Sequence, residues 1–213
     1  MINQLFWDFD GTLFDTYPKM VSAFVEALGD LGIDDVEIDQ DQIYVTMRQH
    51  EVGTAIRKFS AFYGIDERQL RKLNRTHQTK LVEDALPFPG VKEVLEFAKS
   101  MKGRNFLLTH RDDQAKSMLR KFDLLADFSG FVTSDQNFPR KPQPDSINWL
   151  IETNQVDRKK AIMIGDRKLD VAAGHNANIA SCLFDPDGTI VDSGNPEIRV
   201  TEINELVPWL TNK

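Results

Sequence analysis

Two aspartates near the N-terminus are the first candidates for chemistry. Asp8 and Asp10 lie two positions apart at the end of the apolar run of residues 5–9, and Gly11 follows them. Side chains at positions i and i+2 of an extended chain point to the same side, so these carboxylates repel each other unless a cation neutralises them. Mg²⁺ suits such a pair because it uses one or two carboxylates together with water and phosphate oxygens. Gly11 permits a positive φ, with which successive N–H groups can form a nest for an anion such as phosphate.

A second pair of carboxylates, Asp166 and Asp170, stands in the segment Gly-Asp-Arg-Lys-Leu-Asp after another apolar run. Two further side chains could bind an anion beside them. Thr109 supplies a hydroxyl group at the end of an apolar run, and Lys141 lies in a segment that flanking prolines stiffen. An ammonium group held there would neutralise both a phosphate group and the crowded aspartates.

The elements that must position these residues are short apolar runs that alternate with amphipathic segments. We expect buried strands at residues 5–9, 105–109, 131–133, 161–164 and 179–184. Apolar residues at helical spacing separate most of them, as in residues 91–98 and 115–122. Fully apolar strands that alternate with helices indicate a parallel sheet covered on both faces, whose ligands bind beyond the carboxyl ends of the strands. Asp8, Thr109 and Asp166 should therefore share one edge of the sheet.

The stretch of residues 16–86 interrupts this alternation, because it contains helix-like segments and no convincing strand. Apolar residues share helical faces around residues 20–28, 52–59 and 70–81. Prolines at both junctions suit fixed crossings between two modules. We therefore predict a core domain of residues 1–15 and 87–213, with a helical cap domain of residues 16–86 inserted after the first strand.

In their order along the chain, these motifs resemble the four motifs of the haloacid dehalogenase-like (HAD) superfamily: Asp-Phe-Asp-Gly-Thr, a threonine at a strand end, Lys-Pro-x-Pro and Gly-Asp-x-x-x-Asp. The resemblance covers nearly the whole chain. The place of the helical insert is similar to that in the branch of phosphoglycolate phosphatases and β-phosphoglucomutases. The resemblance implies an α/β fold with a Rossmann-like parallel sheet core, helices on both faces and an inserted all-helical cap domain.

The same resemblance implies catalytic roles. Asp8 would be the nucleophile that forms an aspartyl-phosphate, and Asp10 would protonate the leaving alcohol and then activate water. Thr109 and Lys141 would hold the phosphoryl group that is transferred. These roles agree with the physics of phosphoryl transfer, which depends mostly on positioning and charge neutralisation.

The resemblance further implies Mg²⁺ as the cofactor. Asp8, the backbone carbonyl of Asp10 and the carboxylate of Asp166 would bind the ion, and Asp170 would orient them from close by.

The sequence departs from the family pattern after Thr109, where the family often has asparagine and this chain has His110 and Arg111. Both could donate to the substrate or face water. We favour His110 as a residue near the phosphate group of the substrate.

A near copy of the first motif, Asp-Pro-Asp-Gly-Thr, occupies residues 185–189. Pro186 would interrupt a strand there, and too little chain remains for the later motifs to follow. We therefore expect a turn built from Asp, Pro and Gly. A weak Ca²⁺ loop is the alternative, although the rest of an EF-hand pattern is missing.

Charged residues of the cap are candidates for contact with the organic part of the substrate. These are Arg48, His50 and Lys58, each of which could equally form part of a solvated helix face. We favour Arg48, because Gly53 nearby could break the helix and let side chains turn toward the core.

The composition excludes several classes of protein. The chain has 213 residues and a formal net charge of −7, which argues against coating nucleic acid or anionic lipid. Its single cysteine cannot form an intramolecular disulfide, and Asp8 and Asp10 stand where a signal peptide needs apolar residues. We expect a cytoplasmic protein, a monomer or homodimer, whose partner is a small phosphorylated metabolite rather than nucleic acid or membrane.

The leading hypothesis is a Mg²⁺-dependent phosphatase that acts on a small phosphomonoester resembling phosphoglycolate or a sugar phosphate. A phosphosugar mutase of the β-phosphoglucomutase type is one alternative, but the junction at residues 15–20 lacks the histidine that this resemblance would place there. A dehalogenase is disfavoured because Asp10 is present. A non-catalytic binding protein is the other alternative, against which stands the cost of keeping clustered like charges.

Overall fold

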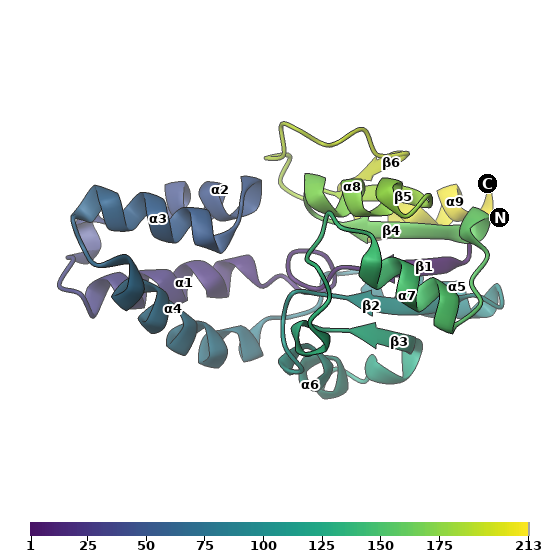
Figure 1. Cartoon of the computed structure of the whole chain (residues 1–213), viewed down its shortest axis with the longest axis horizontal. Helices are drawn as coiled ribbons and strands as arrows, with labels where there is room; N and C mark the ends of the chain where they lie inside the picture. Colours follow the sequence, from purple (N-terminus) through teal and green to yellow (C-terminus); the bar gives the residue numbers. More distant parts are fainter. Residues whose placement is uncertain (213) are drawn as a thin grey trace. The chain divides into compact units, whose positions relative to one another are not determined.

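The computed structural model describes residues 1–212 and divides into two compact units (Figure 1). Met1–Phe14 and the chain from Pro87 onward form the core unit, and Asp15–Leu86 form the cap unit. The cap unit begins one residue earlier than predicted, at Asp15 instead of residue 16. Within residues 1–212, no helix combines the length and the apolar composition that crossing a membrane requires.

The core unit is built on one six-stranded sheet in which every neighbouring pair is parallel. Its strands are β1 (Gln4–Trp7), β2 (Arg104–Leu108), β3 (Phe128–Val132), β4 (Ala161–Gly165), β5 (Ala180–Phe184) and β6 (Ile198–Val200). The order is β3-β2-β1-β4-β5-β6, so chain connections leave in opposite directions on either side of the β1–β4 pair. Such a switch point is where ligands bind in open α/β sheets.

Five of the six strands were predicted to within a few residues. Strand β6 was not predicted, because it is only three residues long and its exposed middle residue is an arginine, Arg199. This strand therefore lacks the continuous apolar run that identified the others.

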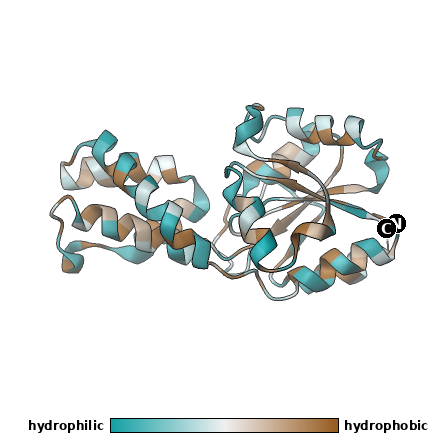
Figure 2. Cartoon of the chain, turned by 90° about the horizontal axis from the view of Figure 1, so that it is seen from below, coloured by the Kyte–Doolittle hydropathy of each residue, from teal (hydrophilic) through white to brown (hydrophobic). Residues whose placement is uncertain are grey.

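Helices cover both faces of the sheet, as predicted (Figure 2). They are α5 (Val91–Ser100), α6 (Gln114–Lys121), α7 (Asp145–Thr153), α8 (Lys168–Asn176) and α9 (Leu206–Thr211). One face packs Phe6, Phe106 and Met163 against apolar residues of α7 and α8 in a single buried cluster. On the other face, the buried side chain of Asn105 has hydrogen-bond partners for both its oxygen and its nitrogen. It accepts a hydrogen bond from the Trp7 indole N–H and donates one to a backbone carbonyl of α5.

The cap unit is all-helical, and its residues contain no strand. Its helices are α1 (Tyr17–Gly29), α2 (Gln40–Gln49), α3 (Val52–Tyr63) and α4 (Glu67–Leu81). Helix α2 was not predicted as a separate element, because its segment is mostly polar. The expected break at Gly53 is wrong by a few residues: Gly53 lies inside α3, and the chain leaves the helical conformation at His50 and Glu51.

Candidate active site

The carboxyl ends of three neighbouring strands bring the predicted residues together. Asp8 follows β1, Thr109 follows β2 and Asp166 follows β4. The ladders continue to this edge, because the Asp8 N–H donates to the Ile164 carbonyl and the Thr109 N–H donates to the Val132 carbonyl. The residues at the switch point are thus held by backbone hydrogen bonds of the sheet itself.

Three buried aspartates form an acidic cluster at this edge. Asp8, Asp166 and Asp170 each offer a carboxylate oxygen, and these oxygens lie within 4.8 Å of one another. Asp170 reaches the cluster from the first turn of α8 because residue 165 at the end of β4 is glycine. A Cβ atom on Gly165 would lie 2.2 Å from the Cβ of Asp170. Gly165 is therefore a site residue, although its place in the Gly-Asp-x-x-x-Asp motif did not by itself predict a role for it.

Lys141 lies against this cluster. Its ammonium nitrogen is 2.7 Å from Oδ1 of Asp8 and 2.5 Å from Oδ1 of Asp170, and all three side chains are buried. Burial by itself would lower the pKa of Lys141, but the two carboxylates outweigh it and raise that pKa above its usual value. The lysine is therefore a permanent cation at the site.

One lysine does not neutralise the whole cluster. Burial raises the pKa of Asp8 to about 7, with further upward contributions from Asp170 and Asp166, although Lys141 opposes the rise. Among residues 1–212, Oδ2 of Asp8 has no hydrogen-bond partner. Buried carboxylate oxygens this close together, one of them unpaired, are a donor set that fits a hard divalent cation such as Mg²⁺.

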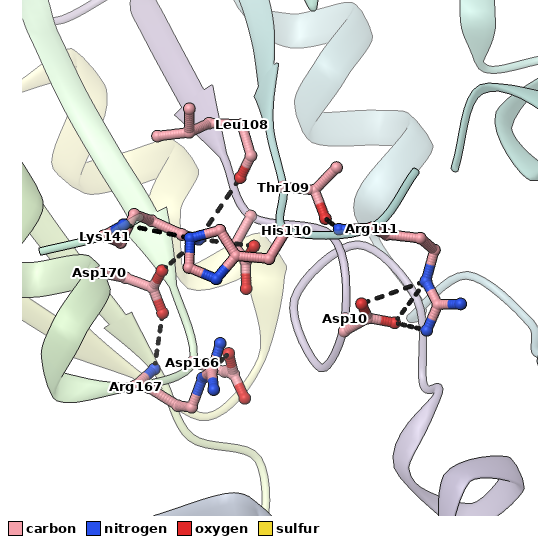
Figure 3. A network of polar contacts seen from close by, with 10 residues as sticks. Asp10, Leu108, Thr109, His110, Arg111, Lys141, Asp166, Arg167 and Asp170 are labelled. Atoms are coloured by element: carbon pink, nitrogen blue, oxygen red, sulfur yellow. Dashed lines mark hydrogen bonds and ion pairs between the residues drawn. The ribbon is translucent and has the colours of Figure 1, made fainter. Parts of the chain in front are cut away.

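Asp10 is not part of the acidic cluster. Its carboxylate forms an ion pair with Arg111, whose Nη2 is 2.7 Å from Oδ1. In the view of Figure 3, these two residues face each other on one side of Thr109, and Lys141, Asp166 and Asp170 lie on the other side. Arg111 was expected either to donate to the substrate or to face water. Its pairing with Asp10 was not predicted, because local sequence does not encode a contact across 101 positions.

His110 is held as a neutral ring. Its Nε2 accepts a hydrogen bond of 3.1 Å from the Lys141 backbone N–H, so the ring proton lies on Nδ1. Burial, together with the charges of Lys141 and Arg140, lowers the pKa of His110 to about 3. A cavity of about 260 Å³ borders Thr109, His110 and Lys141. The predicted contact of His110 with phosphate would therefore be a hydrogen bond from a neutral donor.

Gly11 has the positive φ that was expected, +73°. Its N–H, however, donates to the carbonyl of Phe14 at 2.8 Å within the tight turn that follows β1. The anticipated anion nest therefore does not include this donor, and the contribution of Gly11 is to the shape of the turn.

The second Asp-Pro-Asp-Gly-Thr segment is a turn, as predicted, and its first aspartate has a structural role. The buried Asp185 carboxylate pairs with Arg199 of β6 and accepts a hydrogen bond from the Ile190 N–H. Asp187 accepts hydrogen bonds from the backbone and hydroxyl of Thr189. The two carboxylates thus pin the loop that follows β5.

We expect the Asp185→Asn substitution to lower the free energy of unfolding by about 1.5–3 kcal/mol, the usual worth of a hydrogen bond to a charged group. Urea unfolding measures this loss, with Asp187→Asn at the exposed position of the same turn as the control. If residues 185–189 instead formed the catalytic site, Asp185→Asn would abolish activity without lowering the free energy of unfolding.

Of the cap candidates, Arg48 lies in α2 with its side chain buried, and its guanidinium carbon is 5.1 Å from the centre of the Tyr17 ring. Lys58 donates a hydrogen bond of 3.2 Å to the Thr46 hydroxyl. A role of Arg48 in substrate binding stays a prediction.

A parallel six-stranded sheet covered by helices, with buried aspartates at its switch point, defines an α/β protein with a Rossmann-like fold and an acidic site. More specifically, the chain belongs to the haloacid dehalogenase-like hydrolase family, whose model matches residues 5–183.

Individual relatives agree with this assignment. A phosphoglycolate phosphatase of Vibrio parahaemolyticus is 27% identical, and the match covers 97% of this chain and 95% of the relative. The pyrophosphatase PpaX of Bacillus cereus is 23% identical over 99% of this chain and 97% of its own. Among solved structures, a hydrolase from Streptococcus pneumoniae is 30% identical with a TM-score of 0.69, and the match covers 99% of this chain and 98% of that one.

Proposed function

We propose that this protein is a Mg²⁺-dependent phosphatase that hydrolyses a small phosphomonoester through an aspartyl-phosphate on Asp8. The observation that carries the proposal is the convergence of Lys141 and two further buried aspartates on Asp8. Retaining three buried carboxylates around one lysine would destabilise a scaffold that bound no cation and no anionic substrate. The relatives named as phosphatases support the same reaction class.

In the proposed reaction, a carboxylate oxygen of Asp8 attacks phosphorus while the ester P–O bond breaks. Lys141 neutralises charge on the phosphoryl oxygens. The Thr109 hydroxyl accepts a hydrogen bond of 3.0 Å from the Arg111 N–H, so its own proton is directed to another acceptor, a phosphoryl oxygen in our proposal. Asp10 donates a proton to the leaving alcohol, and it then takes a proton from the water that cleaves the aspartyl-phosphate.

Asp8, Asp166 and the Asp10 carbonyl would hold Mg²⁺, with Asp170 beside them. When bound, the ion would neutralise negative charge on the attacking carboxylate and on the phosphoryl oxygens. The same carboxylates that repel one another without a cation would then bind it.

Phosphate release from a panel of phosphorylated compounds, with Mg²⁺ and then with EDTA, tests the proposal. The panel contains phosphoglycolate, hexose phosphates, nucleoside monophosphates, pyrophosphate and an aryl phosphate. We expect Mg²⁺-dependent release from phosphoglycolate or a sugar phosphate. Release from pyrophosphate alone would show that the substrate is pyrophosphate and not a phosphomonoester. Absence of release from every compound would contradict the proposal.

Mg²⁺ binding should also stabilise the fold by mass action. At one hundred times its Kd, the ion should add about 2.7 kcal/mol to the free energy of unfolding. Thermal unfolding with Mg²⁺ and with EDTA measures this gain, and Asp166→Asn should abolish it. Since this variant also removes like-charge repulsion, we expect it to be no less stable than the parent in EDTA. An unchanged Mg²⁺ response in Asp166→Asn would exclude the acidic cluster as the site.

A further inference from the structure

The Asp10 carboxylate is bound by a guanidinium fork. Nε of Arg111 lies 3.1 Å from Oδ1 and 3.2 Å from Oδ2 of Asp10, and Nη2 lies 2.7 Å from Oδ1. A planar fork restricts the orientation of a carboxylate, which a lysine ammonium cannot do because it acts as a point charge. The rotation of the Asp10 side chain is therefore set by Arg111.

Arg111 is itself anchored at several points of the core unit. Its Nη1 donates to the Gln114 side chain at 2.9 Å, and its carbonyl accepts a hydrogen bond from the Ser134 N–H. Its own backbone N–H donates to the Thr109 hydroxyl. The Arg111 side chain is only 10% exposed. One residue thus links the proposed acid to the proposed phosphate-binding threonine.

The fork leaves the two oxygens of Asp10 unequal. Oδ1 accepts two hydrogen bonds from Arg111, whereas Oδ2 accepts one, which is the longest of the three. The Asp10 side chain is 22% exposed, more than twice the value for Arg111. Because Oδ2 accepts one hydrogen bond from Arg111 rather than two, it is the oxygen with more capacity left to exchange a proton with a bound molecule.

We propose that Arg111 is a positioning residue that holds Oδ2 of Asp10 toward the leaving oxygen of the substrate. This inference rests on the proposed phosphatase function and deepens it. The step starts from Asp10 protonated on Oδ2, and that proton moves to the leaving alkoxide oxygen as the ester P–O bond breaks. The resulting carboxylate then takes a proton from the attacking water, whose oxygen bonds to phosphorus as the bond from phosphorus to Asp8 breaks, and this returns Asp10 to its protonated form. Arg111 takes no part in either proton transfer.

The proposal predicts a dependence on the leaving group. An alkyl phosphate expels a strongly basic alkoxide, which requires a proton from a well-placed acid. p-Nitrophenyl phosphate expels a phenolate that is stable as an anion and needs little help. General acid catalysis contributes about 10²–10⁴-fold, so loss of the positioning residue should reduce the two rates unequally.

The experiment compares Arg111→Ala and Arg111→Lys with the parent on the best alkyl phosphate of the panel and on p-nitrophenyl phosphate. For Arg111→Ala we expect kcat on the alkyl phosphate to fall about 10²-fold or more, with a much smaller fall on the aryl phosphate and an unchanged KM. Arg111→Lys keeps the charge without the fork, so it should recover only part of the loss. Arg71→Ala removes the same charge from an ion pair of α4 and is the matched control.

The outcomes separate this inference from the function on which it rests. Equal losses on both substrates would indicate a general structural role for Arg111 and overturn the inference, while leaving the phosphatase proposal intact. Full activity of Arg111→Ala on the alkyl phosphate would overturn it in the same way. A parent protein that hydrolyses neither substrate would overturn both proposals, and far-UV circular dichroism identifies any variant that loses activity by unfolding.

Discussion

We expect the Asp8→Asn variant to release phosphate at least about 10⁴-fold more slowly than the parent, approaching the ~10⁶-fold loss that removal of a catalytic nucleophile can cause. Asparagine has nearly the same shape as aspartate, but its amide cannot attack phosphorus to form an aspartyl-phosphate. The loss should therefore appear on every substrate of the panel, including the aryl phosphate. This uniform loss distinguishes Asp8 from Arg111, whose replacement should affect alkyl phosphates most.

The fold should survive this substitution. The ammonium group of Lys141 keeps its contact with Asp170, and the number of buried like charges falls by one. Thermal unfolding in EDTA should show Asp8→Asn to be about as stable as the parent. Rapid-quench labelling with a ³²P substrate should detect protein-bound phosphate in the parent and none in the variant. A fully active variant would exclude Asp8 as the nucleophile.

The second large effect concerns the buried cation. We expect Lys141→Met to lower the free energy of unfolding in EDTA by about 3–5 kcal/mol, the usual cost of breaking a buried ion pair by removing one partner. Methionine fills most of the space of the lysine stem, so the loss reports the charge rather than a cavity. Asp8 and Asp170 would remain buried without their cation. Phosphate release should fall as well, because the phosphoryl oxygens lose the same positive charge.

Lys99→Met is the matched control for this variant. The Lys99 ammonium lies 2.6 Å from a carboxylate oxygen of Asp127, a distance close to those in the Lys141 pairs, but Lys99 is exposed. Surface ion pairs contribute little to stability because water and salt screen them. Similar stability changes in the two variants would show that burial does not govern the Lys141 interaction. Mg²⁺ should restore part of the stability of Lys141→Met, since it supplies another cation to the aspartates.

The sequence predicted correctly those features of the fold that depend on short-range patterns of residues. Continuous apolar runs identified β1 and β4 because a strand buried on both faces cannot alternate with polar residues. The aspartates that follow those strands were placed at one edge, since parallel strands end on the same side of a sheet. The turn at residues 185–189 was predicted for the same kind of reason, because Asp, Pro and Gly each favour a turn through their own backbone geometry.

Only the tertiary structure decided which polar groups pair with each other. Asp10 and Arg111 meet across 101 positions because strand order brings the ends of β1 and β2 together. Gly165 and Asp170 are only five positions apart, but their close approach depends on how α8 packs against β4. At Gly11 the difference is local: its N–H, predicted as a donor to an anion, bonds to the Phe14 carbonyl three residues later in the same turn. The sequence by itself thus determined which residues reach the edge of the sheet, through short-range periodicity. Their partners there depend on contacts across many positions, and these contacts determine the electrostatics of the site.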